Sequence, residues 1–79
     1  MTNEEKYKKI FETTFDVDGS ALGEQFTFQD TANWDSLVHL DLIASLEDEF
    51  DVMFEPEDIM HFGSYENGKR ILRGYGVDI

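Results

Sequence analysis

The sequence contains no cysteine, and it has no Lys or Arg between residues 10 and 68. Without cysteine the chain forms no disulfide and offers no thiolate to a metal ion. Its longest apolar run is far shorter than the roughly 20 residues of a membrane-spanning helix, and the N-terminal MTNEEKYKK is too polar for a signal peptide. At 79 residues the chain has the size of one small domain. We therefore expect a single cytoplasmic domain over residues 1–79 that does not enter a membrane.

The missing cations leave the chain strongly acidic. Fifteen of its 18 Asp and Glu residues lie in the stretch without Lys or Arg, and the net charge is -12. Such a surface repels nucleic acid and anionic lipid, and it attracts basic protein surfaces at low salt. Because 41% of the residues are apolar, we expect a folded core rather than a disordered chain. We expect a monomer.

The apolar residues follow the period of a helix. Thr2 and Glu5 have the spacing of a capping box, in which a hydroxyl and a carboxylate each accept a backbone N–H at a helix start. Apolar residues then recur every three or four positions, so we expect a first helix over residues 3–15. Its buried face would contain Tyr7, Ile10, Phe11 and Phe15.

Residues 16–34 interrupt this period with glycines and short polar residues. We expect a long ordered loop here, because loops of this length are uncommon unless they are functional or well packed. The segment Asp16–Ser20 is similar to the start of an EF-hand, but Ala21 and Thr27 stand where that loop needs Gly and Glu. No calcium site of that kind is expected. The apolar residues that would fill the interior are Val17, Leu22, Phe26 and Phe28.

A second helix is expected over residues 36–50. Asp35 is a good N-cap, because its carboxylate can accept a backbone N–H of the first turn. Trp34 precedes this cap and would pack against His39, as in a hydrophobic staple. The buried face would contain Leu42, Ile43, Leu46 and Phe50, and the opposite face Asp41, Ala44, Glu47, Asp48 and Asp51.

Two further helices complete the expected fold. Pro56 suits the first position of a short helix that ends at Gly63. Ser64 can cap a last helix, which Gly74 and Gly76 would end. We therefore expect an all-α, four-helix bundle with three longer helices, one short helix and a long loop between the first two. Its second half would add core residues Phe54, Ile59, Met60, Phe62, Tyr65, Ile71 and Leu72.

Ser36 lies directly after the cap of the second helix, and its hydroxyl allows three interpretations. Serine is common in first turns as a simple cap. Alternatively it is a nucleophile with His39 on nearly the same helix face, although a small helical domain has little room for an oxyanion hole and a cleft. In the third interpretation it is an attachment point, because a phosphoryl group there would meet the positive end of the helix.

The segment from Trp34 to Phe50, W-D-S-L-V-H-L-D-L-I-A-S-L-E-D-E-F, resembles acyl carrier proteins. These proteins carry a D-S-L motif at the start of their second helix. The resemblance runs from about residue 5 to 73 and includes the long first loop, L-E-D-E-F at 46–50 and E-P-E-D at 55–58. It implies the four-helix fold of that family and a carrier domain that is not itself an enzyme.

The resemblance also implies roles for individual residues. Ser36 would receive 4'-phosphopantetheine from coenzyme A through a phosphopantetheinyl transferase, and the thiol of that arm would hold acyl intermediates as thioesters. Asp35 would flank the attachment point and assist the metal-dependent transferase. In such a carrier the gap between the second and third helices could also open to shelter an acyl chain, beside the adaptable Met60. The residues that meet basic patches on acyl-transferring, synthase or ligase enzymes would be Leu37, Asp41, Glu47 and Asp48.

One departure from the family pattern bears on which biosynthetic pathway the carrier would serve. Fatty-acid carriers usually have Gly two residues before the Asp of the motif, where this chain has Asn33. A specialised lipid, polyketide or polysaccharide pathway is therefore favoured. The alternative is a non-enzymatic, acidic helical interaction module in which Ser36 is only a helix cap. His39 and His61 lack H-x-x-x-H spacing, so we expect them in packing rather than in a metal site.

Overall fold

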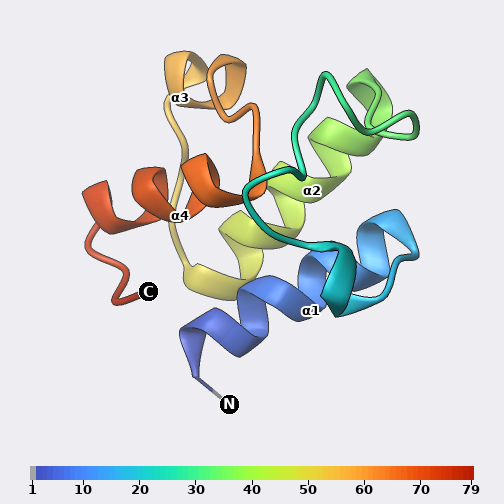
Figure 1. Cartoon of the computed structure of the whole chain (residues 1–79). Coiled ribbons are helices and arrows are strands. Elements are labelled where there is room, and N and C mark those ends of the chain that lie inside the picture. The colour runs from blue at the N-terminus through green and yellow to red at the C-terminus, as the bar shows by residue number, and fades with distance from the viewer. Residues whose placement is uncertain (1) are drawn as a thin grey trace.

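The computed structural model describes residues 2–79, and within that range it contains four α-helices and no named strand (Figure 1). The expected all-α fold with three longer helices and one short helix is confirmed. Residue 1, which the expected domain over residues 1–79 included, lies outside the described residues. No helix in the described range is long and apolar enough to cross a membrane. The helices are α1 (Asn3–Phe15), α2 (Ser36–Phe50), α3 (Pro56–Met60) and α4 (Tyr65–Gly74), with a short 3₁₀ helix η1 (Gly19–Ala21) after α1.

The helices begin at the residues expected to cap them. Thr2 and Glu5 form a reciprocal capping box, with backbone-to-side-chain distances of 2.9 and 3.1 Å. Asp35 and Ser64 each accept a first-turn N–H, both at 3.0 Å. Pro56 occupies the start of α3. These interactions satisfy N–H groups that have no acceptor inside the helix, which explains why short polar residues fix the helix starts.

The ends of α1 and α2 are at the expected residues, whereas the end of α3 is not. α1 and α2 both end at an aspartate in the left-handed conformation, Asp16 (φ 53°) and Asp51 (φ 52°). This conformation is tolerated by Asp because its short polar side chain can interact locally. α3 ends at Met60, three residues before the expected stop at Gly63, whose φ of 58° turns the chain toward α4.

The core is largely aromatic, and Phe11 lies at its centre. The ring of Phe11 has centroid distances of 4.8 Å to both Tyr7 and Tyr65, and of 5.9 Å to Trp34. Large rings suit a chain of this size, because each buries much area and tilted pairs add about 0.5–1.5 kcal/mol beyond that area. The buried hydrophobic residues are Tyr7, Phe11, Phe15, Phe26, Trp34, Leu42, Ile43, Leu46, Phe54, Phe62, Tyr65 and Leu72.

Two residues expected in the interior lie at the surface instead. Met60 is 79% exposed and Phe28 is 44% exposed. α3 has only five residues, and none of them is buried. Because Ile59 is turned partly inward, Met60, the next residue of the helix, faces solvent. Phe28 lies in a turn of the loop, and its ring centroid is 6.0 Å from that of the buried Trp34. Other expected core residues are partly buried: Ile10, Val17, Leu22, Phe50, Ile59 and Ile71.

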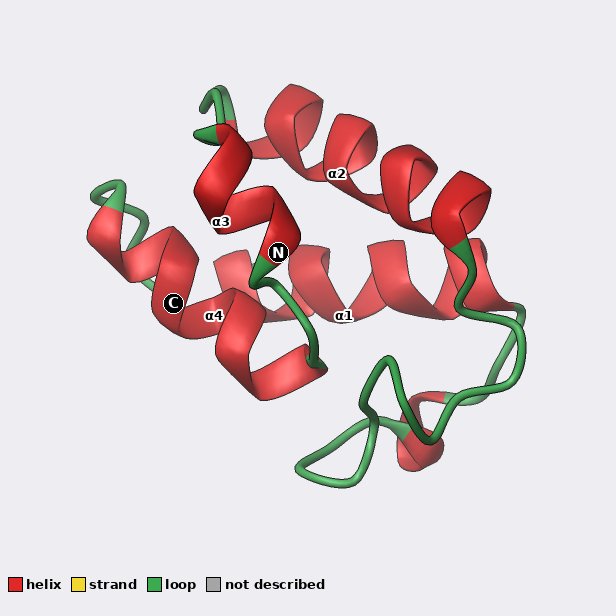
Figure 2. Ribbon diagram, turned by 90° about the horizontal axis from the view of Figure 1, so that it is seen from above, coloured by secondary structure: helices red, strands yellow, loops and turns green. Residues whose placement is uncertain are grey.

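The long loop is ordered by backbone pairing with the α3–α4 connection. Thr27 and Ser64 form an isolated antiparallel bridge, and the N–H of Phe28 donates to the carbonyl oxygen of Gly63 at 2.8 Å. α1 and α2 lie side by side, and the loop leads from the end of one to the start of the other (Figure 2). This pairing places residues 27–30 opposite the first turn of α2, where Ser36 lies.

A buried tyrosine joins α1 to α4. The Tyr7 hydroxyl donates to the backbone oxygen of Tyr65 at 2.6 Å. Burial raises the pKa of the Tyr7 phenol well above its usual range, and it raises the pKa of Tyr65 to about 12. Gly68 lies directly against this pair, and a glycine allows α4 to approach so closely because it carries no Cβ.

Candidate functional site

Ser36 is the first residue of α2, and its side chain is exposed. The helix is capped by the residue before it: Asp35 Oδ1 accepts the N–H of Val38 at 3.0 Å. The expected cap at Asp35 is therefore confirmed, and the Ser36 hydroxyl is not used for that purpose. The first N–H groups of α2 have no acceptor inside the helix, so the positive end of the helix lies beside this hydroxyl.

His39 joins three segments of the chain, and both its ring nitrogens are engaged. Trp34 Nε1–H donates to His39 Nδ1 at 3.0 Å, and His39 Nε2–H donates to the carbonyl oxygen of Ile59 at 2.8 Å. An indole N–H can only donate and a carbonyl can only accept, so these partners select the neutral ring with its proton on Nε2. The expected packing of Trp34 against His39 is confirmed. Neither nitrogen is directed to Ser36, so His39 does not serve as its base here.

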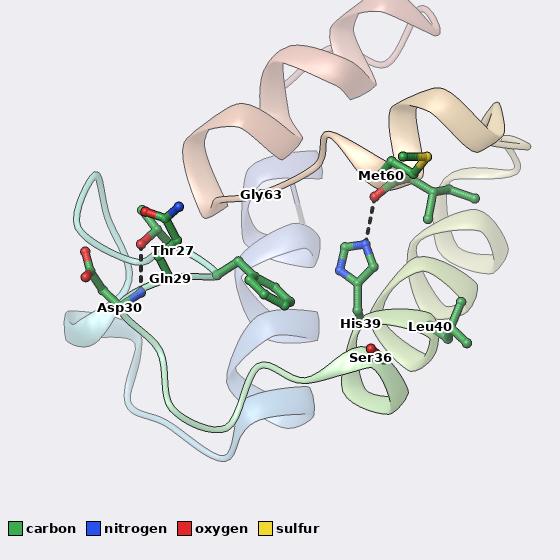
Figure 3. A pocket seen from close by; sticks show the side chains of 10 residues that line it. Thr27, Gln29, Asp30, Ser36, His39, Leu40, Met60 and Gly63 are labelled. Atoms are coloured by element: carbon green, nitrogen blue, oxygen red, sulfur yellow. Dashed lines mark hydrogen bonds between the residues drawn. The ribbon is translucent and has the colours of Figure 1, made fainter.

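A pocket opens beside Ser36 (Figure 3). Its volume is about 730 Å³, within the range of about 300–1,000 Å³ that small-molecule sites occupy. Figure 3 shows Thr27, Gln29 and Asp30 of the loop on one side, Leu40 and Met60 on the other, and His39 between them. The residues that line it are Thr27, Phe28, Gln29, Asp30, Ser36, His39, Leu40, Ile59, Met60 and Gly63.

Three of the four residues expected to meet partner enzymes form one stripe along α2. Leu37 is 79% exposed, and Asp41 and Asp48 are also exposed. Their spacing of four and seven residues places them on one side of a helix. Glu47 differs, because it is only partly exposed and its Oε2 accepts the N–H of Phe54 at 2.9 Å. The structure therefore gives Glu47 an internal contact that holds the α2–α3 connection.

Comparison with models of protein families found no match, and comparison with curated proteins found none either. Function is therefore inferred from the geometry around Ser36 and from the D-S-L segment at residues 35–37. Within residues 2–79, no group of three or more His, Asp and Glu side chains is placed to hold a metal ion.

The sequence predicts a gap that could open between the second and third helices beside Met60, and the pocket is lined from both, but its loop side is not predicted from the sequence. The sequence places Phe28 in the interior and predicts no role for Leu40. One signal was present: Leu37 and Leu40 are apolar but lie off the buried stripe of α2, and two exposed leucines one turn apart indicate an apolar patch on a helix surface. The contribution of Met60 and Phe28 depends on how α3 and the loop meet α2, which local periodicity does not encode.

Proposed function

We propose that this chain is an acyl carrier protein. In this proposal 4'-phosphopantetheine is attached to Ser36, and the chain carries acyl intermediates between partner enzymes, in a specialised lipid, polyketide or polysaccharide pathway. The observation that carries the proposal is that the Ser36 hydroxyl is exposed at the mouth of a pocket while Asp35 caps the helix. A hydroxyl in that position is available to another enzyme.

The surroundings of Ser36 suit a phosphodiester. Transfer from coenzyme A would form a bond between the serine oxygen and phosphorus, break the pyrophosphate bond of coenzyme A and release adenosine 3',5'-bisphosphate, with the serine proton passing to solvent. The anionic phosphodiester would lie at the N-terminus of a helix of 15 residues, where the dipole favours negative charge. The thiol of the arm would then carry the acyl group as a thioester.

The exposed side of α2 suits brief encounters with basic enzymes. Leu37 offers an apolar contact next to Ser36, and Asp41 and Asp48 continue the same side as carboxylates. Each exposed ion pair contributes only about 0.2–1 kcal/mol, so docking through this surface would be weak, fast and sensitive to salt. A carrier that visits several enzymes needs such docking.

The test is the intact mass of the protein after incubation with coenzyme A and a broad-specificity phosphopantetheinyl transferase. We expect a gain of one phosphopantetheine group in the wild type and no gain in Ser36→Ala. Ser45→Ala is the matched control, because Ser45 is also exposed on α2, and it should load like the wild type.

An unchanged wild-type mass, with transferases that load a known carrier in the same reaction, would contradict the proposal. It would favour an acidic interaction module. Loading of Ser36→Ala would also contradict it, since the arm would then be on another residue.

A further inference from the structure

The space between α2 and α3 is closed by His39. Its ring accepts a hydrogen bond from Trp34 in the long loop and donates one to the backbone of Ile59 in α3. A chain that entered the interior from the side of Ser36 would have to break both hydrogen bonds. The ring therefore holds the loop, α2 and α3 together at the place where such a chain would enter.

The space behind His39 is filled by aromatic rings. Phe62 is fully buried, and its ring centroid lies 5.9 Å from that of His39 and 6.3 Å from that of Trp34. Phe54 continues the same packing, 6.3 Å from Phe62. Protein interiors of this kind are close-packed, so an acyl chain could enter only if these rings moved apart.

The space on the other side of His39 is the open pocket beside Ser36, and its lining is apolar for the larger part. Phe28 of the loop lines it. Leu40 and Met60, which are 59% and 79% exposed, border it on the side away from the loop (Figure 3). Methionine is flexible and polarizable and adapts to different guests. Because Ser36 lines the same pocket, a group attached to its hydroxyl reaches this space without passing His39.

We propose that His39 is a positioning residue that keeps the acyl group out of the helical interior, so that the group rests in the outer pocket between Phe28 and Met60. This inference rests on the proposed carrier function. An outer pocket open to solvent shields only a short chain. Among the residues that the structure describes, its lining includes the carboxylate of Asp30 and no Lys or Arg, so an acyl group with its own carboxylate would find no partner there. The cargo is therefore a short, uncharged acyl group.

Methyl NMR of the loaded protein tests where the acyl group lies. The transferase would load butyryl, succinyl or octanoyl arms from the matching coenzyme A thioesters, and the intact mass would be checked first. Failure to load at that stage would refute the carrier function itself, before any question of cargo. With butyryl we expect shifts at Leu40 and Met60 relative to the unacylated arm, and with succinyl we expect much smaller ones.

The octanoyl arm tests the role of His39. In the wild type we expect no shift at the fully buried Leu42 and Leu46 methyl groups. His39→Ala should admit the chain and shift both, whereas His61→Ala, at the other and exposed histidine, should behave like the wild type.

Three results would overturn the inference: octanoyl shifts at Leu42 and Leu46 in the wild type, butyryl arms that leave Leu40 and Met60 unchanged, or equal shifts from butyryl and succinyl. If His39→Ala does not fold, as judged by circular dichroism, the shifts that the three acyl arms cause in the wild type test the inference without that variant.

Discussion

Replacement of Gly68 by alanine should destabilise the protein, because the interior has no room for one more carbon atom. A Cβ on Gly68 would lie 2.7 Å from Phe62 Cε1, and closer still to Phe62 Cζ and the Tyr7 hydroxyl oxygen. Real Cβ atoms essentially never come within 3.0 Å of such neighbours. Relief of the clash would require Phe62 to move within the core or the Tyr7 hydroxyl to leave its hydrogen bond with Tyr65.

The expected change in the free energy of unfolding of Gly68→Ala follows from two opposing effects. Overpacking of a core typically costs about 1–3 kcal/mol, whereas alanine is favoured over glycine inside a helix by about 0.8–1.0 kcal/mol. The clash involves two buried rings, so we expect a net loss of about 1–2 kcal/mol in the free energy of unfolding. The whole free energy of unfolding of a chain of 79 residues is only about 4–12 kcal/mol. The melting temperature should fall by about 4–16 °C.

Gly74→Ala in the same helix is the matched control. Among residues 2–79, no atom lies within 4 Å of a Cβ at that position, so the stability of this variant should equal or slightly exceed that of the wild type. Urea unfolding followed by circular dichroism measures both variants. If Gly68→Ala were as stable as Gly74→Ala, the close packing of α4 against Tyr7 and Phe62 would be refuted.

Two further predictions concern pH and charge. The ordinary pKa of tyrosine is 10, and that of Tyr65 is raised to about 12. Unfolded tyrosines ionise first, so stability should be complete below pH 10 and should fall as the pH rises to about 12, less steeply in Tyr65→Phe. Equal pH profiles of unfolding midpoint would contradict this. Millimolar magnesium or moderate salt should raise the melting temperature, because it screens repulsion within a chain of net charge -12. A decrease, or no change, would show that the carboxylates do not oppose folding.

Helix starts were predictable because the signals that set them are local. Thr2, Asp35 and Ser64 each accept an N–H from within three residues, and Pro56 fixes its own backbone angle. The position of Ser36 at the start of α2 followed from the same chemistry. The staple between Trp34 and His39 spans only five residues and was also expected.

The path of the long loop, the position of α3 and the pocket depend on contacts between distant parts of the chain. The bridge between Thr27 and Ser64 joins the loop to a segment 37 residues further along the chain. No sequence pattern within either segment predicts this bridge. Tyr75 holds the start of α3 through its hydroxyl, which accepts the N–H of Glu55 at 2.8 Å and donates to Asp58. These contacts determine how α3 sits against α2. They therefore determine the pocket, the exposure of Met60 and the closed space behind His39.

The central claim is that Ser36 carries a phosphopantetheine arm, and site-resolved tandem mass spectrometry tests it most directly. After reaction with coenzyme A and a transferase, the proposal predicts the added group on the peptide that contains Ser36, with Ser20, Ser45 and Ser64 unmodified. An unmodified chain beside a loaded control carrier, or the group on one of the other serines, would contradict it.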